Sequence, residues 1–148
     1  MKTAIIAIAA VLAGCNIECP DAPAEPVDLG WATIDTGAVH TPGSVDTVAC
    51  RTFDNPFGED AHLDAIVVKQ TRSIAGVSVY AREGADGPSD VCPTDLGELL
   101  YDRAEQSSLV VDLQLPATSG IVVVVHVINL SELEARSVAS VDLHGVAP

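Results

Sequence analysis

From residue 31 to the end of the chain, short segments in which apolar and polar residues alternate are separated by turn residues. Alternation with a period of two is typical of a half-buried β-strand, and clusters of Gly, Pro, Asn and Asp end such strands. The pattern predicts strands at residues 31–34, 45–53, 62–70, 77–82, 109–115, 121–130 and 135–146. For residues 94–102 we predict one or two helical turns instead, with Thr94 or Asp95 as the cap.

Turns are predicted at residues 35–37, 41–44 and 54–58, where Gly, Pro, Asn and Asp gather. In segment 62–70 the alternation places Leu63, Ala65 and Val67 on one face of the strand, and Ile66 and Val68 on the other. Segment 121–130 is apolar almost throughout and rich in β-branched residues, which predicts a strand buried on both sides. Seven or eight modest strands predict an all-β fold, an antiparallel β-sandwich or jelly roll.

The N-terminus has a different pattern. Lys2 precedes a short apolar stretch, residues 3–12, which falls short of the about 20 residues that span a bilayer. A charged start, a short apolar core and small residues at the exit are typical of an export signal. The exit, Leu12-Ala13-Gly14-Cys15, resembles the bacterial lipobox. This resemblance implies cleavage before Cys15 and diacylglycerol attached to its thiol.

The predicted organisation is therefore a signal peptide at 1–14, a lipidated Cys15 with a proline-rich tether at 15–28, and a β-sandwich domain at 29–148. Asn16 follows the lipidated residue, and by resemblance to Gram-negative lipoproteins this favours the outer membrane over the inner one. The predicted membrane contact is thus the lipid itself. The formal net charge of −14 argues against a nucleic-acid partner, because binding phosphates requires a basic surface.

If the chain is exported, its four cysteines raise the question of which of them form a disulfide. Cys15 is consumed by the lipid, which leaves Cys19, Cys50 and Cys92 in an oxidising compartment. Cys50 and Cys92 both fall within the predicted domain, whereas Cys19 falls in the tether. We predict a Cys50–Cys92 disulfide, with Cys19 free or paired elsewhere, although sequence alone leaves the connectivity open.

Two parts of the domain resemble a known family. The first covers residues 46–63 and continues through 66–68 to 74–80; the second covers 115–116, 122–129 and 137–144. Together, over about residues 45–148, they resemble the N-terminal domain of the copper type II, ascorbate-dependent monooxygenases, which includes the peptidylglycine and dopamine hydroxylating enzymes. The resemblance implies an antiparallel jelly roll, in agreement with the strand pattern.

In that family three imidazoles bind one copper, two from adjacent histidines and one from a later strand. By resemblance, His126 matches the later histidine, but Ala75 and Gly76 stand where the adjacent pair would be. Copper held by imidazoles needs their number and geometry, and the family's second copper domain has no counterpart in this sequence. The resemblance therefore implies the fold and argues against the hydroxylating activity. His126 is interpreted first as a structural histidine and second as a remnant metal ligand.

Other candidate chemistry is weaker. Three sets of residues are candidates for metal binding or catalysis, and we interpret each first as structural or solvated: the histidines His40, His62 and His144; the carboxylates Glu132 and Glu134 with Asp142; and a calcium loop of Asp86, Asp90 and Asp95. The sequence contains no Gly-x-Ser-x-Gly elbow, no His-Glu-x-x-His motif and no phosphate-binding glycine loop.

Three functions remain open at this point. The first is a noncatalytic binding or structural module without a cofactor, displayed on a lipid anchor, with an unidentified protein as a possible partner. The second is a copper-binding or copper-handling lipoprotein that uses His126. The third is an accessory subunit that completes a separate copper monooxygenase. A fold alone does not decide among them.

Overall fold

The strands of this protein pair as a nested series, the first with the last and each following strand one step further inward. The computed structural model describes residues 25–84, 86–105 and 107–148. Its strands are β1 (Asp28–Thr41), β2 (Asp46–Asp54), β3 (Ala61–Gln70), β4 (Ile74–Arg82), β5 (Glu98–Arg103), β6 (Ser107–Leu115), β7 (Gly120–Ile128) and β8 (Ala135–Val146). β1 pairs with β8, β2 with β7, β3 with β6 and β4 with β5, all antiparallel.

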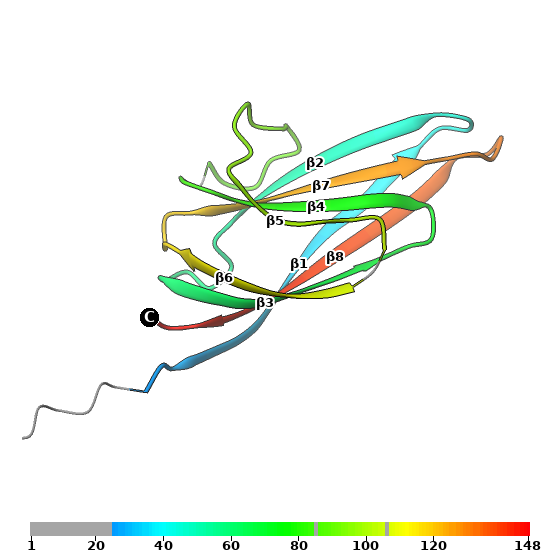
Figure 1. The fold of residues 1–148 in the computed structure, drawn as a ribbon. Coiled ribbons are helices and arrows are strands. Elements are labelled where there is room, and N and C mark those ends of the chain that lie inside the picture. Colours follow the sequence, from blue (N-terminus) through cyan, green and yellow to red (C-terminus); the bar gives the residue numbers. More distant parts are fainter. Residues whose placement is uncertain (1–24, 85, 106) are drawn as a thin grey trace, which may run out of the picture.

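These pairs form two four-stranded sheets, in the orders β1-β8-β3-β6 and β2-β7-β4-β5, which pack face to face (Figure 1). The alternation of consecutive pairs between two sheets is the jelly-roll arrangement of an antiparallel β-sandwich. The predicted fold class is therefore confirmed. The inward faces of both sheets supply the core, which is built mainly from Val, Leu and Ile.

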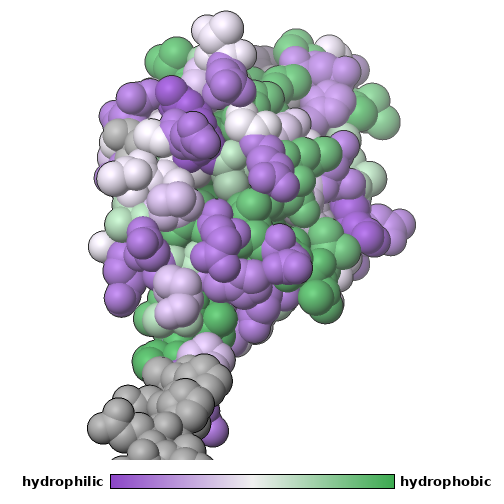
Figure 2. Space-filling view, turned by 60° about the vertical axis from the view of Figure 1, so that its left-hand side comes forward, coloured by the Kyte–Doolittle hydropathy of each residue, from purple (hydrophilic) through white to green (hydrophobic). Residues whose placement is uncertain are grey.

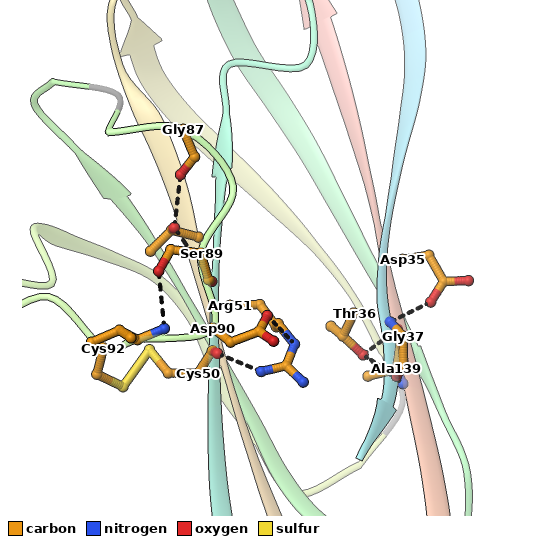
Figure 3. A network of polar contacts seen from close by, with 12 residues as sticks. Asp35, Thr36, Gly37, Cys50, Arg51, Gly87, Ser89, Asp90, Cys92 and Ala139 are labelled. Carbon is orange, nitrogen blue, oxygen red and sulfur yellow. Dashed lines mark hydrogen bonds and ion pairs between the residues drawn. A yellow bond between two sulfur atoms is a disulfide. The ribbon is translucent and has the colours of Figure 1, made fainter.

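β8 begins and ends at the predicted residues, but the first strand does not end at 35–37 as predicted. β1 instead continues to Thr41 through a bulge between Asp35 and Ala38. Gly37 has a φ of 68° there, and its amide donates to the Asp35 carboxylate at 2.7 Å. At the bulge the Thr36 hydroxyl takes the place of a backbone partner for Ala139: it donates to the Ala139 carbonyl (2.9 Å) and accepts from the Ala139 amide (3.2 Å) (Figure 3). Turn-forming residues here bend a strand without ending it.

The predicted helical turns at 94–102 are wrong, and β5 occupies most of that segment. Leu100 and Tyr101 are consecutive and both buried, a pattern that does not alternate. A register shift between Val79 and Tyr80 of the neighbouring strand accompanies it. The Tyr101 hydroxyl donates to the carbonyl of Glu105 at 2.8 Å. Tertiary packing therefore decides the strand over the local capping signal.

The single alternation predicted for 62–70 is also wrong. A register shift between Leu63 and Ala65 of β3 exchanges the two faces of the strand. Leu63 therefore shares the core with Ile66 and Val68 instead of with Val67. A bulge of this kind inserts one residue and reverses the periodicity beyond it.

β7 lies in the middle of its sheet, between β2 and β4. Its first half is buried on both faces, since Val122 and Val123 are each 1% exposed or less. Towards its end His126 is partly exposed and Ile128 is exposed. The prediction of a strand buried on both sides therefore holds for the first half of β7 only.

Candidate functional site

His126 lies on the outer face of the second sheet, with its side chain 44% exposed. Its cross-strand neighbours are Val48 on β2 and Gly76 on β4. Asp46 is the nearest carboxylate, with its Oδ2 atom 4.0 Å from the His126 Nε2 atom. Around this histidine the sheet surface therefore offers one imidazole and one carboxylate.

These residues do not fit a three-imidazole copper centre. Gly76 stands directly beside His126 in the sheet and carries no donor side chain, and Ala75 precedes it. The other three histidines have carboxylate or amide partners on the first sheet. Among residues 25–84, 86–105 and 107–148, no group of three or more His, Cys, Asp or Glu side chains is arranged to hold a metal ion.

Those three histidines each link neighbouring strands. The Nδ1 atom of His144 lies 2.7 Å from Asp64 and its Nε2 atom 3.1 Å from Asp28, so both ring nitrogens have a carboxylate. The Trp31 ring packs on the same imidazole, with centroids 4.9 Å apart. These contacts tie β1, β8 and β3 together on the outer face of the first sheet.

His62 and His40 also link neighbouring segments of the chain through their ring nitrogens. The Gln114 amide donates to His62 Nδ1 at 2.8 Å, while His62 Nε2 lies 3.1 Å from Asp112. His40 Nδ1 lies 2.5 Å from Glu134. Each imidazole therefore contacts partners on an adjacent strand or turn, as expected of a structural histidine.

The carboxylates that the sequence offered as a catalytic pair have separate partners in the structure. Whereas Glu134 contacts His40, Asp142 accepts from Lys69 (2.7 Å) and from Thr33 (2.7 Å). The hydrogen bond from Lys69 holds the pKa of Asp142 below its usual value, against the opposing effect of burial. This pairing leaves no shared site between Asp142 and Glu134.

The three aspartates of the candidate calcium-binding loop also have separate partners. Asp86 pairs with Arg82 at 2.7 Å and Asp90 with Arg51 at 3.1 Å. Asp95 accepts instead from the amide of Gly97 at 3.0 Å. The carboxylates therefore bind three different groups, and the structure does not bring them together.

The predicted Cys50–Cys92 disulfide is present, with the two Cα atoms 5.2 Å apart. Cys50 is buried on β2, and Cys92 lies in the segment 83–97 that joins β4 to β5. We call this segment the β4–β5 loop. Figure 3 shows the disulfide beside the contacts that hold this loop against β2.

Backbone bonds reinforce the attachment of the β4–β5 loop. Thr52 and Ser89 exchange amide–carbonyl hydrogen bonds at 2.8 and 3.3 Å, and the Thr52 hydroxyl donates to the carbonyl of Gly87 at 3.0 Å. Thr52 is the cross-strand neighbour of Val122. These bonds and the disulfide attach the β4–β5 loop to β2 beside Val122, whose side chain is 1% exposed.

A pocket of about 370 Å³ opens where the ends of β4 and β6 meet the β4–β5 loop. Its apolar lining includes Leu113, Leu115 and Pro116. Figure 2 brings this end of the molecule forward and shows hydrophobic surface between hydrophilic side chains. A volume of this size is within the range of small-molecule sites.

Three acidic residues, Glu83, Asp95 and Glu98, also line this pocket, and all three are exposed. None of them forms an ion pair with another described residue, whereas Arg82, the basic residue of the lining, pairs with Asp86. The local charge is therefore uncompensated. Gly97 closes the loop onto the end of β4, because a Cβ atom at this residue would overlap the backbone carbonyl of Ala81.

Ser119 supplies a polar group deeper in the pocket. It is 4% exposed, it belongs to the lining, and its hydroxyl makes no hydrogen bond to another described residue. Among the described residues, the fully buried side-chain oxygens without a partner are those of Thr41 and Gln70, so the Ser119 hydroxyl retains some contact with solvent. An unused hydroxyl facing a cavity is therefore available to a ligand.

Sequence reasoning did not find this pocket. The acids of the β4–β5 loop were visible as a Gly- and Pro-containing turn region, but their neighbours on the other sheet, Leu113 to Ser119, are distant in sequence. Only the nested strand pairing brings the ends of β4 and β6 to the same end of the sandwich. Cys15 lies outside the described residues, so its lipidation stays a prediction.

In the part of the chain that the structure describes, no helix is long and apolar enough to cross a membrane. Comparison with protein-family models found no match for this chain, and neither did comparison with curated proteins or with solved structures.

Proposed function

We propose that this protein is an exported, lipid-anchored binding or structural module of the cell envelope, and that its jelly roll is noncatalytic. The observation that carries the proposal is the sequence Leu12-Ala13-Gly14-Cys15 directly after a short apolar segment with a charged start. The Cys50–Cys92 disulfide supports export, because such bonds persist in oxidising compartments.

The position of the N-terminal segment also supports display on an anchor. Residues 25–27 are exposed and lead into β1 at one end of the sandwich (Figure 1). The turns that join β1 to β2 and β7 to β8 lie at the opposite end. A domain held by its N-terminus would therefore present those turns away from the membrane.

The geometry of the histidines supports the noncatalytic part of the proposal. His62, His144 and His40 all contact carboxylates or amides of neighbouring strands. An imidazole that acts as a base needs a ring nitrogen directed at a reacting group. In His62 and His144 both ring nitrogens contact neighbouring side chains, and in His40 the Nδ1 atom contacts Glu134.

We expect Cys15→Ser to abolish membrane attachment completely, because the thiol is the atom that carries the lipid. The measurement is fractionation of cells that express the full chain, combined with mass spectrometry of the N-terminal peptide. Cys19→Ser is the matched control and should leave both the lipid and the membrane attachment intact. A density gradient then separates outer from inner membrane, and we expect the outer one. A native N-terminus other than a lipidated Cys15 would refute the anchor.

Copper handling is the second candidate, favoured by the exposed His126 imidazole with Asp46 beside it. Our leading proposal expects the full chain to bind no copper at micromolar concentrations, since one imidazole and one carboxylate make an incomplete centre. Titration monitored by electron paramagnetic resonance measures this. If the wild type binds one equivalent that His126→Ala removes, copper handling replaces the leading proposal.

A gain-of-site variant gives this titration a positive control. Gly76→His places a second imidazole beside His126, and a Cβ atom at Gly76 would meet only the Arg103 carbonyl at 3.7 Å, an ordinary contact. We expect this variant to bind copper and the further change His126→Ala to abolish the binding. Copurification of a monooxygenase with the wild-type chain would instead favour the accessory-subunit function.

A further inference from the structure

The pocket at the ends of β4 and β6 combines features that select a ligand. Its three carboxylates, Glu83, Asp95 and Glu98, form no ion pair with another described residue and attract positive charge. They do not converge on one point, since no group of three acidic, histidine or cysteine side chains among the described residues is placed to hold one ion. Charge that is distributed in this way matches a ligand whose positive groups are separated.

The space between the charges is apolar. Leu113, Leu115 and Pro116 line this space; Leu113 is partly exposed and Pro116 is exposed, whereas Leu115 is 1% exposed. Methylene groups placed against such side chains lose their contact with water, which is favourable. A ligand that fits this pocket therefore alternates cationic groups with short hydrocarbon segments.

From this pattern we infer that the pocket binds a linear polyamine, an organic cation whose ammonium groups are joined by methylene chains. The ammonium groups pair with Glu83, Glu98 and Asp95, and the methylene segments pack on the leucine and proline side chains. The Ser119 hydroxyl accepts a hydrogen bond from an ammonium group inside the pocket. The net charge of −14 favours the approach of such a cation over long distances.

This inference rests on the proposed function, because it names the ligand of the binding module. It does not depend on the lipid anchor. The pocket lies at the end of the sandwich from which the N-terminal segment leaves (Figures 1 and 2). In the anchored protein, the ligand would therefore bind near the membrane side of the domain.

The test is isothermal titration of the full mature chain in detergent with spermidine, with putrescine, and with calcium or magnesium chloride as separate arms. We expect spermidine to bind with one-to-one stoichiometry, more tightly than putrescine, since it offers a third ammonium group. Binding should weaken steeply as salt is added, because exposed charges are screened. Equal binding of the divalent metals would overturn the inference, because it would show general attraction of cations.

Matched variants locate the site. Glu98→Gln and Glu83→Gln should each weaken spermidine binding about tenfold, the effect of losing one charged hydrogen bond. Ser119→Ala should weaken it by a smaller factor. Glu132→Gln makes the same charge change in the β7–β8 turn, at the opposite end of the sandwich, and should leave the affinity unchanged.

Thermal melts of each variant verify the fold, and both glutamates of the pocket are exposed, so their amides are compatible with it. An equal loss of spermidine affinity in Glu132→Gln and Glu98→Gln would contradict a localised site. Wild-type affinity in the double variant Glu83→Gln and Glu98→Gln would contradict it as well. Mass spectrometry of Cys15 in the same preparation reports the anchor separately. Failure of the ligand inference and failure of the anchor are therefore distinguishable.

Discussion

Replacing Asn129 by alanine is expected to lower the free energy of unfolding by about 3 kcal/mol, the effect of leaving several buried backbone groups without partners. Asn129 follows β7 and is 5% exposed. Its Nδ2 atom donates to the carbonyl oxygens of Thr41 (3.0 Å), Pro42 (2.9 Å) and Leu133 (2.8 Å). Its Oδ1 atom accepts from the amide (3.1 Å) and the hydroxyl (2.8 Å) of Ser131.

These bonds join the turn after β1 to the turn after β7, two segments that no strand pairing connects at that point. Gly43 packs closely between the same turns, because a Cβ atom there would overlap the carbonyl of Glu132. The side chain of Asn129 thus reinforces the backbone bonds from Ser44 to Ser131 (2.8 Å) and from Asn129 to Val45 (3.3 Å), which join the same turns. An alanine supplies neither donor nor acceptor, and the carbonyls are too enclosed for water to replace every bond.

Chemical denaturation of wild type and Asn129→Ala measures the difference. Ser131→Ala is the control, because it removes one hydroxyl and leaves the asparagine bonds to the three carbonyls intact. We expect its loss to be well under half that of Asn129→Ala. Equal effects of the two changes would show that the serine, not the asparagine amide, holds the turns together.

Asn55 repeats this arrangement at the opposite end of the sandwich. It is 6% exposed, and its Nδ2 atom donates to the carbonyls of Glu59 (2.9 Å), Pro116 (3.0 Å) and Leu115 (3.4 Å). Its Oδ1 atom accepts from the amide of Phe57 at 2.8 Å. The two ends are therefore closed by the same chemistry, with a buried asparagine linking two turns.

Removal of the disulfide by the double change Cys50→Ala and Cys92→Ala is expected to lower the free energy of unfolding by about 3–4 kcal/mol, through the entropy gained by the unfolded chain. The two cysteines are 42 residues apart, so the bond closes a long loop in the unfolded state. It is also the covalent attachment of the β4–β5 loop to β2. The bonds between Thr52 and Ser89 remain in the variant, so we expect the strands of the sandwich to persist.

Denaturation with and without a reducing agent measures this contribution. Reduced wild type should match the double variant, while Cys19→Ser should behave as the unreduced wild type. If reduction has no effect on the unfolding midpoint of the wild type, the disulfide does not contribute in this way. Because the β4–β5 loop also carries two of the pocket acids, Glu83 and Asp95, spermidine titration of the reduced protein reports how far the pocket depends on the bond.

Much of the fold was predictable because the strands are half-buried and alternate cleanly. β6 keeps its odd residues Leu109, Val111 and Leu113 towards the core as predicted, and β8 keeps its bounds. The wrong predictions for β1 and β3 fall where the hydrogen-bonded pairing between strands is irregular. Local alternation cannot reveal the bulges in β1 and β3, because the register of a bulge depends on the partner strand.

The candidate sites were less predictable than the fold. Cysteine spacing and position identified the disulfide, because only two cysteines fell within the domain. His126 was visible in the sequence, but its solitary position beside Gly76 required the register between β4 and β7. Predicting the pocket would require the tertiary packing as well, because the pocket depends on how the ends of the two sheets pack together.

The pairing of β1 with β8 has a consequence for how the chain reaches this structure. In the first sheet, β1 contacts no strand except the last, and Trp31 finds its position only opposite His144. Folding dominated by such distant pairings is slow, because a large loop must close before its contacts form. β1 therefore cannot complete its pairing until β8 has been synthesised, and we expect the first sheet to form late in folding. Late formation of this sheet is compatible with the export that we propose, because a chain that crosses a membrane through a narrow channel does so before it folds.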